Sequence, residues 1–265
     1  MKISIDDAIK ELSIQWQASG IEKGDTILIH SNIKRTLIKM RRKGIKLLPE
    51  HIFQSMLNAV GSKGTLLLPL FNFDFPTSKF FDISNTPSQM GALTEIARLH
   101  SGSVRTGHPI YSFAVIGYHS KAFAKIDNIS GYGADSPFSL LRSLNGKIAI
   151  LDLEDQNSMT FYHYVEEMLN VSYRYLKEFD GIYIDRNGLK TNRNYKLFVR
   201  DLESNVLTHV NPAGELMWDA GLYKGDRPLI NNGLRTINAQ DMYEFVTKII
   251  ESGNAENTLF KYGKQ

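Results

Sequence analysis

The stretch from residue 25 to residue 69 constrains the fold most, because it alternates a strand, a helix and a second strand. Asp25–His30 is a largely apolar run that leads into the polar loop His30-Ser31-Asn32, as expected of a buried strand. Glu50–Val60 has helical periodicity, and the apolar run Thr65–Pro69 follows a turn at residues 61–64. Segments of these types and lengths predict a βαβ unit in an α/β sheet.

The rest of the chain extends this pattern and then changes character. Further elements are expected as helices at Ile5–Gln17, Gln89–His100, about Met159–Leu169 and Ala239–Ser252, and as strands at Tyr111–Gly117 and Lys147–Leu151. From about residue 171 to residue 210, alternation and the Asp185-Arg186-Asn187-Gly188 turn indicate antiparallel strands. We therefore predict a single α/β domain over residues 1–265. It has a central, mostly parallel or mixed sheet flanked by helices, with a small antiparallel C-terminal lobe.

Composition excludes several kinds of chemistry. The chain has 265 residues, of which 42% are hydrophobic, so it can bury a sizeable core. It contains no cysteine, which rules out disulfides, thiolate metal sites and a cysteinyl acyl-enzyme. No segment approaches the roughly 20 apolar residues that span a bilayer. We therefore expect a cytoplasmic protein with no membrane partner.

Positive charge is concentrated in one segment, although the net charge is only +3. Residues 34–46 form a run that is rich in Lys and Arg. One interpretation is a solvated loop or helix face, and the other is an anion-attracting rim for phosphates. The sequence has no groove-reading motif and no basic repeats with interleaved aromatic residues, so a nucleic-acid partner is not expected. The oligomeric state, including a homo-oligomer, stays open.

Among the seven histidines, His163 has the most informative neighbours. Its segment opens a helix directly after the strand at residues 147–151, and such junctions lie at the ligand-binding edge of an α/β sheet. Thr160 precedes His163 by three residues and Glu166 follows it by three, so both share its helix face. A neighbouring carboxylate is expected to raise the pKa of the imidazole. The competing interpretation is a core-facing helix with an exposed salt link.

Several catalytic patterns are absent from the sequence. No His-Glu-x-x-His motif occurs, so we expect no metal. There is also no Gly-x-Ser-x-Gly elbow and no phosphate-binding loop with its lysine, which argues against the common hydrolase and kinase classes.

Six short segments, taken in order, resemble the aminoglycoside 3-N-acetyltransferase family over about residues 20–250. The family's strand ending in His-Ser-Ser appears with Asn32 in place of the second serine. Its Pro-Ser-x-Met-Gly-x-Leu-x-Glu segment matches residues 87–95, and its Asn-x-Ser/Thr-x-x-His-x-x-Glu region is similar to residues 157–166. The other matching segments are Gly64–Pro69, Arg105–Ala114 and Tyr132–Pro137.

The resemblance implies an acyl-coenzyme A-dependent N-acyltransferase in which His163 is the general base. A positioned imidazole that takes the proton of an attacking amine contributes a factor of about 10² to 10⁴. Glu166 and Ser158 are the other catalytic candidates. Ser31 is a conceivable covalent nucleophile, but direct transfer needs fewer assumptions. The candidate coenzyme-binding residues are His30, Ser31, Asn32, Lys34, Met90, Ser112 and Phe113.

The acceptor is less tightly constrained. Candidate substrate-binding residues are Phe73, Asp74, Tyr132 and Tyr162. Many relatives carry an acidic residue followed by phenylalanine where this chain has Val210-Asn211-Pro212-Ala213. Because the chain is slightly basic, an anionic acceptor is expected. Some members of the superfamily that this chain resembles are similar to N-acyltransferases that modify nucleotide-linked amino sugars for surface polysaccharides, so the resemblance makes a nucleotide-linked (for example dTDP-linked) amino sugar the first expectation. An aminoglycoside antibiotic is the alternative, and a non-catalytic coenzyme- or sugar-binding protein is a third. A deacylating hydrolase would need a serine within reach of His163.

Overall fold

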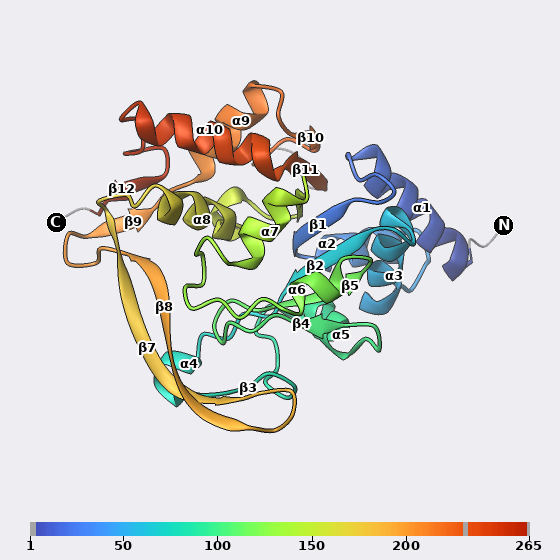
Figure 1. The fold of residues 1–265 in the computed structure, drawn as a ribbon. Helices are drawn as coiled ribbons and strands as arrows, with labels where there is room; N and C mark the ends of the chain where they lie inside the picture. The colour runs from blue at the N-terminus through green and yellow to red at the C-terminus, as the bar shows by residue number, and fades with distance from the viewer. Residues whose placement is uncertain (1–3, 230–232, 264–265) are drawn as a thin grey trace.

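The computed structural model describes residues 4–229 and 233–263. Its centre is a mixed sheet of seven strands in the order β10-β11-β6-β1-β2-β5-β4 (Figure 1). The strands β6, β1 and β2 are parallel, and the neighbours on either side are antiparallel. The bounds are β1 Thr26–Ser31, β2 Thr65–Pro69, β4 Val104–Arg105, β5 Phe113–Gly117, β6 Lys147–Leu151, β10 Lys224–Gly225 and β11 Leu234–Asn238. The predicted α/β class with a mixed sheet is confirmed.

Helices cover both faces of this sheet. Ile27 and Ile29 of β1 belong to one hydrophobic core and Leu28 to the other, because successive side chains of a strand point to opposite faces. The first core contains side chains from α1 Ile5–Ala18, α2 Lys34–Arg42, α3 Pro49–Val60 and α5 Ala92–Leu99. The second contains side chains from α7 Pro137–Ser143, α8 Thr160–Met168, α9 Asn211–Asp219 and α10 Ala239–Glu251.

Local sequence signals account for several helix ends. Ser4 and Asp7 form a capping box at the start of α1, and Pro49 occupies the first turn of α3, where its missing N–H costs nothing. Helix α5 begins at Ala92, three residues later than predicted, because Gly91 has a φ of 103°. This left-handed conformation is cheap for glycine alone, and it ends the preceding turn.

The antiparallel part is a long hairpin of β7 Arg174–Ile184 and β8 Lys190–Arg200, with Arg174 opposite Arg200. It arches away from the central sheet toward α4 Phe75–Ser78 and β3 Phe80–Asp82 (Figure 1). Strand β3 joins it in parallel with β7. The strand β9 Val206–Thr208 follows the hairpin in the chain and pairs with β12 Phe260–Tyr262 in a separate two-stranded sheet. The predicted antiparallel lobe is therefore present, but segments far away in the sequence complete it.

Two short helices, α6 Ser120–Phe123 and the 3-10 turn η1 Asp155–Asn157, complete the described elements. In residues 4–229 and 233–263, no helix is long and apolar enough to cross a membrane.

Candidate active site

The candidate site lies where the parallel strands β1 and β6 end and α8 begins. His30 near the end of β1 pairs with Ile150 of β6, so both strands finish at the same edge of the sheet. The chain leaves β6, forms η1 and enters α8 at Thr160. The hydroxyl of Thr160 lies 3.2 Å from Nε2 of His30, and both side chains are buried. This is the ligand-binding edge expected of an α/β sheet.

His163 forms a close pair with Glu166 one turn further along α8. Nδ1 of His163 lies 2.8 Å from Oε2 of Glu166, and the two residues are 7% and 0% exposed. The ionised carboxylate accepts a hydrogen bond from Nδ1–H, which leaves Nε2 as the unprotonated nitrogen of the ring. Nε2 is the only atom of this ring that can then act as a base. The i, i+3 spacing read from the sequence produces this geometry directly.

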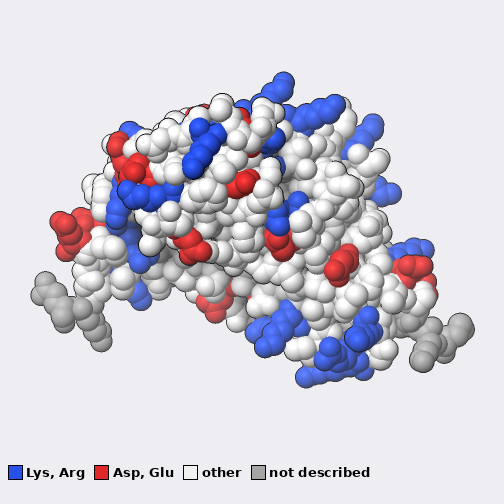
Figure 2. Space-filling view, turned by 90° about the horizontal axis from the view of Figure 1, so that it is seen from below, with Lys and Arg blue, Asp and Glu red and all other residues white. Residues whose placement is uncertain are grey.

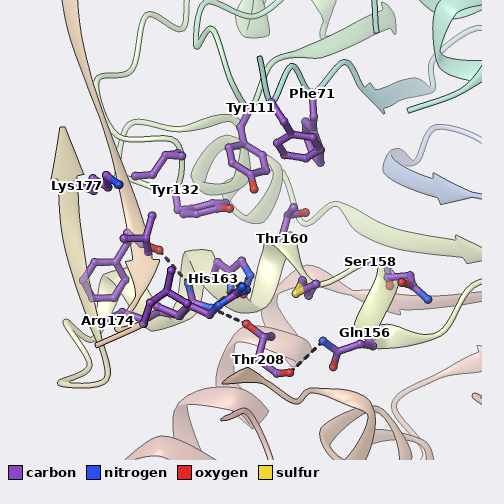
Figure 3. Close-up of a pocket in the computed structure, with 18 of the residues that line it drawn as sticks. Phe71, Tyr111, Tyr132, Gln156, Ser158, Thr160, His163, Arg174, Lys177 and Thr208 are labelled. Carbon is purple, nitrogen blue, oxygen red and sulfur yellow. Dashed lines mark hydrogen bonds between the residues drawn. The ribbon is translucent and has the colours of Figure 1, made fainter. Parts of the chain in front are cut away.

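Arg174, the first residue of β7, completes the polar cluster. Its Nε lies 2.8 Å from Oε2 of Glu166, and its Nη2 lies 3.4 Å from Nε2 of His163. Nη1 donates to the backbone carbonyl of Phe198, and Nη2 also donates to the hydroxyl of Thr208. Figure 3 shows His163, Arg174 and Thr208 converging at one end of the cavity. Nothing in the sequence around Arg174 indicates this role, because its partners lie on three other elements.

The pKa of His163 is lowered to about 4, against the direction expected from its carboxylate neighbour. Burial is the largest cause and the Arg174 guanidinium is the next, while Glu166 acts to raise the pKa. Glu166 thus acts in the expected direction, but the expectation that the pKa of His163 would be raised overall is wrong. Burial also acts to raise the pKa of Glu166, but Arg174 and the His163 hydrogen bond outweigh it and lower the pKa. The pair is thus a neutral imidazole beside a carboxylate.

A cavity of about 510 Å³ opens onto His163. Phe71, Tyr111 and Tyr132 stand over it on one side, and the hairpin forms the opposite wall (Figure 3). The Tyr132 and His163 rings meet edge to face with centroids 5.4 Å apart. His30, Phe73, Ser158 and Tyr132, all predicted site residues, line the cavity together with His163.

The charged side chains that line this cavity are all cationic. Arg174, Lys177 and Arg200 contribute to its wall, and among the described residues no Asp or Glu does. The cavity differs in this respect from the face of the molecule shown in Figure 2, where Lys and Arg are interspersed with Asp and Glu. Lys177 and Arg200 were not singled out by the sequence, because only the hairpin fold brings them to the wall of this cavity.

A second groove, of about 700 Å³, holds four of the seven residues proposed to bind the coenzyme. Ser31, Asn32, Lys34 and Met90 line it, together with Gly91. Met90 also lines the first cavity, so the groove and the cavity share part of their walls. A Cβ built on Gly91 would have no protein atom within 4 Å, so the groove is open at this turn.

Most of the basic run, residues 34–42, forms helix α2, and its Lys and Arg side chains lie on two sides of the helix. Lys34 and Arg41 are seven residues apart, which is about two helical turns, and both line the groove. Arg35, Lys39 and Arg42 instead line another hollow against α1. The segment is therefore a helix, one side of which borders the groove.

Apart from Glu166, which bonds to His163, four predicted site residues line neither the His163 cavity nor the groove. Ser112 is fully buried and bonds to Arg105 and to the carbonyl of Leu70, and Phe113 is enclosed by neighbouring rings. Tyr162 is fully buried, and its hydroxyl donates to Asp155. Asp74 faces a separate hollow. One-residue steps along a strand or helix change the direction of a side chain, so neighbours of cavity residues point elsewhere.

Ser158 lines the cavity, but its hydroxyl bonds within a local turn. It donates to the backbone carbonyls of Glu154 and Asp155 at 3.1 and 3.3 Å. The described hydrogen-bond partners of the His163 ring are Glu166 and Arg174. In residues 4–229 and 233–263, no serine hydroxyl is hydrogen-bonded to the His163 ring, and a serine hydrolase needs such a contact.

Comparison with known proteins identifies the family. The model of the aminoglycoside 3-N-acetyltransferase family matches residues 28–251. The chain belongs to this family. Aminoglycoside N(3)-acetyltransferase VII of Streptomyces paromomycinus is 26% identical to it over 171 residues. That match covers 57% of this chain and 57% of the relative, so the chain matches little more than half of the relative's length.

Solved structures of similar fold are found along nearly the whole chain. The structure described as AAC-IIIb binary with CoASH has a TM-score of 0.74 and 19% identity, and the match covers 97% of this chain and 98% of that chain. The structure described as AAC-VIa bound to sisomicin has a TM-score of 0.73 and 20% identity, with 93% and 98% covered. At these identities the likeness establishes the fold, which agrees with the mixed sheet and helices described above.

Proposed function

We propose that this chain is an acyl-coenzyme A-dependent N-acyltransferase that acts on the amino group of an amino sugar. The observation that carries the proposal is that His163, bonded to the buried Glu166, lines a cavity that shares Met90 with the Ser31–Asn32 groove. One ligand in the groove and another in the cavity would meet beside this pair. His163 is buried but lines the cavity, which favours catalysis over a purely binding role.

The geometry supports direct transfer with His163 as the general base. Nδ1–H is held by Glu166, so Nε2 takes a proton from the amine as its nitrogen bonds to the thioester carbonyl carbon. The bond from that carbon to sulfur breaks, and the proton then passes to the leaving thiolate. A lowered pKa keeps the imidazole neutral, and therefore able to accept a proton, at neutral pH.

The groove fits a coenzyme with phosphate groups and a narrow arm. Lys34 and Arg41 supply positive charge along it, and Gly91 leaves open space at its turn. A relative in the family is described with CoASH bound, which supports the same co-substrate here. No set of three or more His, Asp or Glu in the described residues is placed to hold a metal ion.

The comparisons favour an aminoglycoside acceptor. The family model and the Streptomyces relative are both named for aminoglycosides, and AAC-VIa is described as bound to sisomicin. None of these names mentions a nucleotide-linked sugar. The antibiotic acceptor, which was the alternative from the sequence, is therefore better supported than the first expectation.

One structural observation favours the second candidate, a nucleotide-linked amino sugar. The cavity wall carries Arg174, Lys177 and Arg200 without a described carboxylate, which suits phosphate groups and repels a polycation. Phe73 is half exposed and, with Tyr111, offers an aromatic surface for a base or sugar ring. Phosphates would bind most strongly to the guanidinium of Arg200, which can donate two parallel hydrogen bonds, whereas the Arg174 nitrogens already contact Glu166, Phe198 and Thr208.

Coenzyme A should stabilise the chain through the groove. A ligand that binds only the folded state adds about 2.7 kcal/mol at a concentration of 100 times its Kd. We expect millimolar coenzyme A to raise the melting temperature, and Lys34→Glu to reduce this rise. Lys39→Glu is the matched control, since it makes the same charge change on the other side of α2. An unchanged melting temperature, or equal effects of the two variants, would count against this placement.

Specificity constants decide between the two acceptors. The family assignment predicts faster free-thiol release from acetyl-coenzyme A with sisomicin, whereas the cationic cavity predicts faster release with nucleotide-linked amino sugars. For an anionic acceptor, KM should rise from low to physiological salt, where charges are screened over about 8 Å. Equal or higher kcat/KM with the aminoglycoside would reject the nucleotide-linked acceptor. Activity with neither would count against the acyltransferase proposal itself.

A further inference from the structure

A positive charge stands beside the atom that is proposed to take the proton. Nη2 of Arg174 lies 3.4 Å from Nε2 of His163. Arg174 is only 8% exposed, so water screens this contact little. A guanidinium stays charged at every working pH. General-base catalysis does not require such a neighbour, so its presence calls for an explanation.

The guanidinium is held in place from several sides. It forms an ion pair with Glu166 on α8 and donates to the backbone of Phe198 on β8. Nη2 also reaches the Thr208 hydroxyl at 3.3 Å on β9. With these contacts on three elements, the side chain is not free to turn away from His163. The charge is therefore a fixed feature of this end of the cavity.

Other charged and titratable groups near His163, on the elements packed against it, also act on the charge of its ring. Glu166 on α8 favours a protonated ring, and Arg200 on β8 disfavours it. Burial raises the pKa of Tyr132 well above its usual value, so this phenol stays neutral. Tyr173 interacts with Glu166, and its raised pKa keeps it neutral as well. His30 lines the same cavity, and burial lowers its pKa to about 4, so it too is uncharged at neutral pH.

We propose that Arg174 is a positioning residue that keeps both partners of the proton transfer uncharged before they react. Its guanidinium disfavours a proton on Nε2 of His163 and, equally, an ammonium group brought next to that atom. The acceptor therefore reaches the thioester as a free amine. Its nitrogen bonds to the carbonyl carbon, Nε2 takes the amine proton, and the carbon–sulfur bond breaks.

This role also explains where the proton goes next. An imidazolium ion between the Arg174 guanidinium and the cavity is disfavoured, although Glu166 stabilises it in part. His163 should therefore release the proton quickly to the leaving thiolate, which becomes the free thiol. The effect on the amine rests on the proposed function, whereas the effect on His163 does not.

Titration of His163 in the ligand-free chain tests the inference. Histidine ring signals are followed by NMR against pH, with His163→Asn used for assignment. We expect the wild-type ring to stay neutral at pH 5, and Arg174→Gln to move its midpoint up by about one to three pH units. Arg174→Lys retains the positive charge and should restore most of the wild-type behaviour.

A second variant covers the case in which Arg174→Gln does not fold. Arg200→Gln leaves the Glu166–Arg174 pair intact and should raise the midpoint less, with the same sign. A purely structural role for Arg174 predicts a lower melting temperature with an unchanged His163 midpoint. Equal midpoints in the wild type and every folded variant would overturn the inference.

The activity assay separates this inference from the proposed function. If the chain is an acyltransferase, the acidic limb of its kcat/KM profile should move to higher pH in Arg174→Gln, together with the NMR midpoint. The sign follows because a raised pKa leaves more of His163 protonated, and so inactive as a base, at a given pH. A shifted midpoint without acyl transfer to any acceptor would reject the enzyme function and retain the effect of Arg174 on His163.

Discussion

His163→Ala is expected to fold normally and to lose at least about two orders of magnitude in kcat/KM. A general base contributes a factor of about 10² to 10⁴, and the described residues show no second base bonded to the His163–Glu166 pair. Loss of the ring leaves Nη2 of Arg174 its contact with Thr208. Steady-state thiol release under identical conditions measures the effect.

His51→Ala is a suitable control for the loss of an imidazole. His51 lies in α3, against the opposite core, where its Nδ1 accepts a hydrogen bond from the backbone of Leu48. The His51→Ala variant should be slightly less stable because this cap is lost, and its turnover should stay close to that of the wild type. If His163→Ala retained turnover within a factor of a few, the general-base assignment would be rejected.

Glu166→Ala is expected to destabilise the fold far more than His163→Ala or His51→Ala. Glu166 is 0% exposed and lies 2.8 Å from Nε of Arg174, which is itself buried. Removing one partner of a buried ion pair leaves an uncompensated charge and costs about 3–5 kcal/mol. Urea unfolding at pH 7 measures the loss in the free energy of unfolding.

Two comparisons make this prediction specific. Asp180→Ala breaks an ion pair with Lys79 in which both side chains are more than half exposed. This variant should change stability little. The double variant Glu166→Ala/Arg174→Met should be less destabilised than the sum of the two single variants, because no charge is left unpaired. A loss for Glu166→Ala no larger than that for Asp180→Ala would contradict the prediction.

The site is built from groups whose charges depend on one another. Oε2 of Glu166 contacts both Nδ1 of His163 and Nε of Arg174 at 2.8 Å. The carboxylate therefore fixes the imidazole tautomer and compensates the guanidinium with the same oxygen. Its other oxygen, Oε1, is buried with no described hydrogen-bond partner. A shared partner of this kind makes the effects of single substitutions non-additive, which is why the double variant is informative.

Local patterns in the sequence account for the central layer of the fold. The apolar run of Asp25–His30 and the helical periodicity of Glu50–Val60 appear as β1 and α3 at nearly the predicted positions. The His163–Glu166 pair also follows from local geometry, since residues three apart on a helix are neighbours. The resemblance added what periodicity does not indicate, namely that Ser31, Asn32, Lys34 and Met90 share one groove.

Other parts of the fold depend on pairing over long sequence distances. Strand β3 pairs with β7 about 100 residues later, and β9 pairs with β12 rather than with the hairpin. A short strand carries no signal for its partner, because its backbone groups pair equally well with any suitably placed edge. The sequence therefore predicted antiparallel strands at residues 171–210 without their full set of neighbours.

Sequence patterns alone were sufficient to predict the α/β class, the His163–Glu166 spacing and the segments that match the family. They did not predict that Arg174, Lys177 and Arg200 would reach the cavity, or that Ser112, Phe113 and Tyr162 would lie in the interior. Nor did they predict that the pKa of His163 would fall, to about 4. Periodicity and helix spacing depend on neighbouring residues, whereas burial and electrostatic contact depend on which distant segments of the chain pack together.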